Sequence, residues 1–146
     1  LDMYDKKVDN ESLGGRTPSD YTPNLLQLRS FEGIHNEIFA KDNKRAREVY
    51  SFYADLKKCF IELNRVLKPG AISCFVVGNR TVKNVNIPTN LIIQELGELL
   101  NWSHLETFIR NIPNKRMPSR NSPTNLKGKT GSTMTKEYIV VLKKND

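Results

Sequence analysis

The sequence lacks any long hydrophobic run. No stretch of about 18 consecutive apolar residues is present, so no membrane-spanning helix is expected. The chain starts with Leu1-Asp2-Met3 and shows no basic and apolar leader, so we expect no secretory signal. These two absences predict a cytoplasmic protein that has no membrane partner.

Cysteine and histidine are scarce. Cys59 and Cys74 show neither metal-ligand spacing nor a second pair, which predicts a reduced protein without a metal site. We expect both cysteines to be small core residues, one in a helix and one in a buried strand. His35 and His104 are isolated, so we expect them at the surface or the boundary of the core rather than as ligands.

Acidic residues are missing from one stretch. Residues 110–136 contain seven basic residues and no Asp or Glu, whereas the rest of the chain holds 16 basic and 16 acidic residues. The whole net charge of +7 therefore falls on this stretch. It is rich in polar and turn-forming residues and cannot bury itself, so it predicts a surface that binds a polyanion, with nucleic acid as the leading partner. The alternative is a solvated insertion without a ligand.

The pattern of apolar residues predicts three helices. In each, apolar side chains recur every three or four residues, which is typical of an amphipathic helix. The expected ranges are 23–39, 49–67 and 88–100. Pro69-Gly70 ends the second helix sharply, and the polar run 41–47 either separates the first two helices or joins them.

Three apolar segments predict strands, at residues 71–77, 105–112 and 137–143. The first is β-branched and aromatic and ends at Gly78-Asn79, which fits a strand covered on both faces. The order of helices and strands predicts an α/β fold, with 1–22 as an irregular lead-in and 23–146 as a single α/β domain. The last connection, 113–136, needs about 24 residues and is far longer than an ordinary hairpin loop. It is also the basic stretch.

Five motifs resemble the later half of an S-adenosylmethionine-dependent DNA methyltransferase. They are KRAREVYSFY at 44–53, RVLKPG at 65–70, VVGNR at 76–80, RNIPNKR at 110–116 and TKEYIVVL at 135–142. The chain is more closely similar to the enzymes that methylate exocyclic amines, on cytosine N4 or adenine N6. The resemblance covers roughly residues 43–143. It implies that a helix ending in Leu-Lys-Pro-Gly leads into the fifth strand of a Rossmann-like sheet, which a final antiparallel hairpin completes.

Two motifs of that family are missing. Amino-methylating enzymes carry a Pro-Pro-aromatic tetrapeptide that holds the flipped base, and this chain has no Pro-Pro pair. They also need a glycine-rich turn after a strand for the cofactor, and no glycine of this chain follows a predicted strand in such a turn. The catalytic residues and the main S-adenosylmethionine motif are therefore expected outside the chain. We expect it to be a carboxy-terminal fragment that is inactive alone.

The expected contact residues lie in two places. Gly78-Asn79-Arg80 ends a strand, where open α/β sheets place their ligands, so Asn79 and Arg80 are predicted to lie near the substrate. The alternative there is an ordinary strand-ending turn. In the basic stretch, cationic side chains would bind phosphates and asparagines would read base edges. The residues predicted to contact DNA are Arg110, Asn114, Lys115, Arg116, Arg120, Lys127 and Lys129.

Double-stranded DNA is the partner that the resemblance implies, together with a cognate restriction endonuclease system. Two other interpretations remain open at this point. One is a nucleic-acid-binding module without catalysis, and the other is a methyltransferase that acts on RNA or protein. The sequence names neither the target base nor the recognition sequence.

Overall fold

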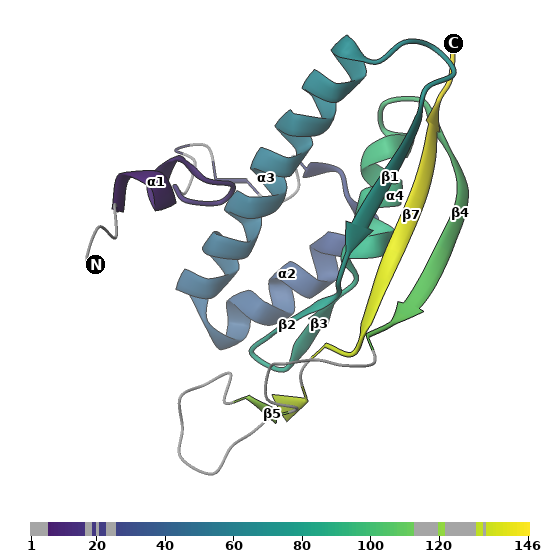
Figure 1. Cartoon of the computed structure of the whole chain (residues 1–146). Helices are drawn as coiled ribbons and strands as arrows, with labels where there is room; N and C mark the ends of the chain where they lie inside the picture. The colour runs from purple at the N-terminus through teal and green to yellow at the C-terminus, as the bar shows by residue number, and fades with distance from the viewer. Residues whose placement is uncertain are drawn as a thin grey trace, which may run out of the picture. The chain divides into compact units, whose positions relative to one another are not determined.

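The computed structural model describes residues 6–16, 19, 21–22, 26–112, 120–121, 131–132 and 134–146. It divides into two compact units, residues 1–66 and residues 67–146 (Figure 1). The boundary coincides with the Leu-Lys-Pro-Gly stop that the sequence predicts as a helix end. No helix of the described residues is long and apolar enough to cross a membrane.

The first unit is helical. It contains α1 (Lys6–Glu11), α2 (Arg29–Lys41) and α3 (Asn43–Val66), so the lead-in that was predicted to be irregular holds one short helix. Asp42 alone separates α2 from α3, so the two helices are distinct and do not join into one. Its carboxylate accepts a hydrogen bond from the Arg45 backbone N–H at 3.1 Å and so caps the start of α3.

Aromatic and aliphatic side chains of α2 and α3 form the core of this unit. Phe31, Ile38 and Phe60 are completely buried, and Tyr50 and Tyr53 are nearly so. The lead-in is fastened to α3, because the Gly14 backbone N–H donates to the Asp55 carboxylate at 3.0 Å. The predicted burial of Cys59 is wrong: its position on α3 leaves it exposed.

The second unit is built on a three-stranded sheet in the order β1-β7-β4. Its strands are β1 (Ile72–Val77), β4 (Trp102–Asn111) and β7 (Lys136–Lys144), and β7 runs antiparallel to both neighbours. The expected pairing of the last two long strands as an antiparallel hairpin is confirmed. Two short pairs, β2 (Arg80–Val82) with β3 (Val85–Ile87) and β5 (Arg120–Asn121) with β6 (Gly131–Ser132), complete the described strands.

Helix α4 (Thr89–Glu98) covers one face of this sheet. Ile92, Ile93 and Leu96 are buried on the helix, as are Val140 and Leu142 on β7. Gly97 allows this close approach, because a Cβ at that position would lie 2.8 Å from Leu142 Cδ1. Side chains also join the layers, since Gln94 Nε2 donates to Thr107 Oγ1 at 3.0 Å.

The opposite face of the sheet is largely uncovered among the described residues. Val76, Ile139 and Phe108 form one row across it, and Val76 and Phe108 are 59% and 49% exposed. Cys74, on the same side of β1, is exposed too. The predictions that residues 71–77 form a doubly covered strand and that Cys74 is buried are therefore wrong for this chain. The fold is α/β with a small antiparallel sheet.

Candidate nucleic-acid interface

The turn predicted to lie near the substrate and both ends of the basic stretch come together at one edge of the sheet. Val77, the last residue of β1, pairs with Tyr138 near the start of β7, and Asn111 at the end of β4 pairs with Lys136. The ends of β1 and β4 and the start of β7 therefore lie at the same end of the sheet, which we call the sheet edge (Figure 1). The basic stretch leaves the sheet and returns to it there, where the Ile112 N–H donates to the Thr135 carbonyl at 2.9 Å.

The Gly-Asn-Arg turn lies directly beyond β1 at this edge. Asn79 Oδ1 accepts a hydrogen bond from the Asn90 backbone N–H at 3.3 Å, in the first turn of α4. It thus satisfies one of the N–H groups that a helix start leaves without an intrahelical acceptor. Asn79 therefore has a structural role, whereas Arg80 is exposed at the start of β2.

Gly78 shows what the turn leaves room for. A Cβ on this glycine would clash with the thioether of Met134, which comes just before β7. The space over the Gly78 backbone is thus filled by a side chain of the same unit. The described residues around this turn therefore do not fit the open glycine-rich approach that S-adenosylmethionine needs.

Arg110 is the predicted DNA contact that the structure describes with its side chain. Its guanidinium forms an ion pair with the Glu137 carboxylate, across the β4–β7 pair. The Arg110 side chain remains 65% exposed, so the pair is solvated and only weakly stabilising. The first acidic residue after the basic stretch therefore offsets one of its seven charges.

The remaining predicted contacts are not described by the structure as side chains. Arg120 is described through its backbone, which pairs in β5 with Ser132 of β6. The residues of this set that lie outside the described ranges are Asn114, Lys115, Arg116, Lys127 and Lys129.

Charge is distributed unequally between the two units. Residues 1–66 contain 11 basic and 11 acidic residues, whereas residues 67–146 contain 12 basic and five acidic residues. Cations of the first unit are balanced locally, as in the pairs Lys41–Glu37 at 2.7 Å and Lys58–Asp55 at 3.0 Å. The whole positive excess belongs to the unit that contains the sheet edge, and this favours an anionic partner there.

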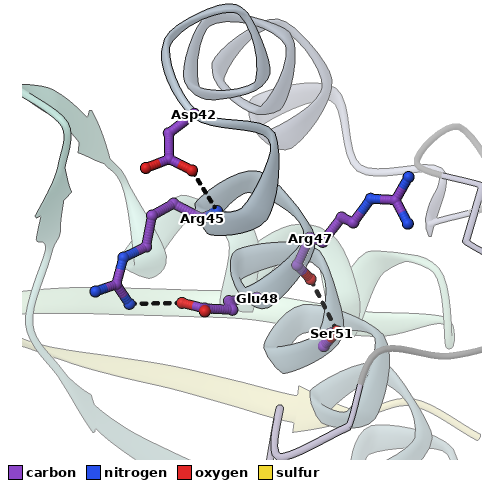
Figure 2. Close-up of polar contacts among 5 residues, drawn as sticks. All are labelled: Asp42, Arg45, Arg47, Glu48 and Ser51. Carbon is purple, nitrogen blue, oxygen red and sulfur yellow. Dashed lines mark hydrogen bonds and ion pairs between the residues drawn. The ribbon is translucent and has the colours of Figure 1, made fainter.

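The first motif of the resemblance, residues 44–53, begins α3. Figure 2 shows the side chains of Arg45 and Arg47 leaving the helix on opposite sides. Arg45 pairs with Glu48 at 2.6 Å, while Ser51 Oγ donates to the Arg47 carbonyl at 2.8 Å. The Arg47 guanidinium lies 4.8 Å from the centre of the Tyr21 ring. These contacts give the motif a role in holding the first unit together.

His35 was expected at the surface or the boundary of the core, but it is 1% exposed. Its Nε2 lies 2.8 Å from the Tyr21 hydroxyl, and Phe31 and Tyr50 contribute neighbouring rings. Burial lowers the pKa of His35, because the low-polarity surroundings disfavour the imidazolium. A helical face that reads Phe31, His35, Ile38 was the available signal for this burial. His104 is exposed, as expected.

Among the described residues of the first unit, an open cavity of about 420 Å³ lies between α1 and α3. Charged residues at its wall include Asp55 and Lys58, which already pair with each other. Among the described residues, no group of three or more His, Cys, Asp or Glu side chains could hold a metal ion.

The β2–β3 hairpin was not predicted from the sequence. Val82 and Val85 flank a two-residue connection, Lys83-Asn84, whose φ angles are +50° and +62°. Such angles belong to the tight turns that join short antiparallel strands. A β-branched pair spaced by exactly two residues was the available signal, but Lys-Asn is not one of the usual dipeptides of that turn.

Comparison with known proteins gives one informative relative. No family model and no solved structure matches the chain. A Type II methyltransferase, M.MvaI of Kocuria varians, is 48% identical over 141 residues. The alignment covers 94% of this chain but only 31% of the relative. The resemblance to a methyltransferase that the sequence predicts is therefore confirmed, for a chain that spans about a third of the length of that enzyme.

Proposed function

We propose that this chain is the carboxy-terminal part of a site-specific DNA methyltransferase, which moves a methyl group from S-adenosylmethionine to an exocyclic amine of cytosine or adenine. The observation that carries the proposal is the 48% identity to a Type II methyltransferase over nearly the whole chain. The share of that enzyme without a counterpart here leaves ample length for the missing tetrapeptide and the cofactor turn. In the intact protein the tetrapeptide would hold a base flipped out of the duplex, and the glycine-rich turn would hold the cofactor.

The uncovered face of the sheet supports the fragment interpretation. Ile72 and Val76 of β1 are 62% and 59% exposed, although a continuous apolar strand is usually covered on both sides. Strand β1 is also an edge strand among the described residues, so its outer N–H and C=O groups have no neighbouring strand. Further strands beside β1 and helices on this face, supplied by the rest of a longer protein, would bury both. We infer that the sheet is the end of a larger Rossmann-like one.

The charge of the sheet edge supports DNA as the acceptor. The basic stretch joins the ends of β4 and β7 next to the turn after β1, so cations adjoin the edge where the resemblance places the substrate. Lysine and arginine that touch phosphates supply affinity that does not depend on sequence, while asparagines in the same stretch can read base edges. In this proposal the chain binds DNA, and the catalytic residues lie outside the chain.

Replacing Lys115 and Arg116 by alanine tests this role. If both side chains bind phosphates, the slope of log K against log salt should fall by about two, and affinity for duplex DNA should fall with it. Fluorescence anisotropy of the 146-residue chain with a labelled duplex, over a series of salt concentrations, measures both quantities. Unchanged affinity with an unchanged slope would contradict a DNA-binding role for the basic stretch.

The two rival interpretations differ in what they leave unexplained. A stand-alone binding module does not account for close similarity to part of a much longer methyltransferase. A methyltransferase for RNA or protein accounts for that similarity, and the identity of the methyl acceptor separates it from the proposal.

A further inference from the structure

The β2–β3 hairpin lies at the same edge of the sheet as both ends of the basic stretch. It follows β1 after Gly78-Asn79, and Gly78 is in contact with Met134, just before β7. Figure 1 shows it beyond the arrowhead of β1, at the end where β4 stops and β7 starts. A partner bound at this edge by the basic stretch would therefore meet the hairpin as well.

One face of the hairpin is fixed by burial. Val82, Val85 and Ile87 are all less than 10% exposed. The two strands are in register and are joined by a two-residue turn, so the hairpin is formed without a partner. Binding through a preformed element avoids the cost of ordering a loop.

The rest of the hairpin is polar and carries only positive charge. Thr81 and Asn86 lie opposite each other in the register and are exposed, as is Asn84 at the tip. Arg80 lies opposite Ile87 in the register, on the face of the buried residues, but is itself exposed at the open end of the hairpin. Arg80 and Lys83 add two cations, and residues 63–94 contain no Asp or Glu. Hydroxyl, amide and cationic groups without carboxylates are the set that contacts phosphates and base edges in DNA.

The size of the hairpin fits a DNA groove. Three residues per strand span roughly 10 Å, and a two-stranded ribbon fits the major groove, which is about 12 Å wide and 8.5 Å deep. We propose that the β2–β3 hairpin is a second DNA-contacting element, in which Arg80 and Lys83 bind phosphates and Thr81, Asn84 and Asn86 face the groove. This inference rests on the proposed function, since it takes duplex DNA as the partner.

The test removes two charges and keeps a polar side chain at each position. In the 146-residue chain, the double variant Arg80→Gln, Lys83→Gln should lower the salt slope of duplex DNA binding by about two and weaken affinity at least tenfold at moderate salt. The variant Arg80→Lys, Lys83→Arg keeps both charges and should keep the slope. The matched control is Lys68→Gln, Lys143→Gln, which removes two cations from exposed positions near the start of β1 and the end of β7, at the opposite end of the sheet. This control should leave the slope unchanged.

The outcomes separate this inference from the proposed function. If the hairpin variant keeps the wild-type slope while Lys115→Ala, Arg116→Ala lowers it, the hairpin does not contact DNA and the basic stretch does. If the hairpin variant and the Lys68, Lys143 control lost salt slope and affinity equally, the effect would come from net charge alone, and the hairpin site would be overturned. If the wild-type chain does not bind duplex DNA, both proposals fail. Circular dichroism of each variant shows that the fold is retained.

Discussion

Burial decides the behaviour of His35, whose side chain packs among the aromatic rings of the first unit. Its neutral imidazole shares a hydrogen bond with the Tyr21 hydroxyl, which ties the residues before α2 to the helix. The helical face of Phe31, His35 and Ile38 was the local signal for this burial. The Tyr21 and Tyr50 rings beside His35 come from outside α2, so local pattern could not predict this part of its environment.

The depressed pKa of His35 predicts how stability depends on pH. The unfolded chain binds a proton near the ordinary pKa of 6.5, while the folded chain resists it, so the unfolded state holds more protons below that pH. The free energy of unfolding should therefore decrease as the pH falls below about 6.5. Urea unfolding at pH 7.5 and pH 5.5, followed by circular dichroism, measures this change.

His35→Gln and His104→Gln provide the matched pair for that measurement. The first removes the buried titrating group and should reduce the pH dependence, whereas the second changes an exposed histidine and should preserve it. The same pH dependence in His35→Gln as in the wild-type chain would show that other groups cause it.

Among the elements, the helices and long strands could be predicted because their apolar periodicity is local. The last two long strands are examples, and the Pro69-Gly70 pair marks the end of α3 in the same local way. The antiparallel pairing of those two strands followed from the family resemblance. The number of covered faces of β1 could not be predicted, because it depends on which other segments pack against the strand. The β2–β3 hairpin escaped for another reason, since its turn uses Lys-Asn at positive φ rather than a glycine-containing dipeptide.

Two helical glycines should respond to alanine with opposite signs. Gly97 of α4 has Leu142 Cδ1 at 2.8 Å from the position of a Cβ, and Leu142 is buried and has little freedom to move. Gly97→Ala should therefore destabilise the chain by about 1 kcal/mol, in spite of the higher helix propensity of alanine.

Gly33 of α2 is the matched control for that substitution, because nothing lies within 4 Å of its Cβ position. Gly33→Ala should stabilise the chain by about 0.5–1 kcal/mol through helix propensity alone. Denaturant titrations of both variants measure the two changes. A stabilising Gly97→Ala would show that α4 does not pack on β7 as closely as described.

At the scale of the whole molecule, a neutral helical unit precedes a unit that carries the entire net charge of +7. The sequence alone located that charge, and the fold adds that the predicted substrate turn, both ends of the basic stretch and the missed hairpin share one edge of the sheet.

The identity of the methyl acceptor tests the central claim most directly. The longer protein that we propose contains this chain, supplied with labelled S-adenosylmethionine and with duplex DNA, RNA and protein in parallel, should label the DNA. Mass spectrometry of the nucleosides should then reveal N4-methylcytosine or N6-methyladenine, while the 146-residue chain alone should transfer nothing. Labelling of RNA or protein instead of DNA, or methyl transfer by the chain alone, would contradict the account.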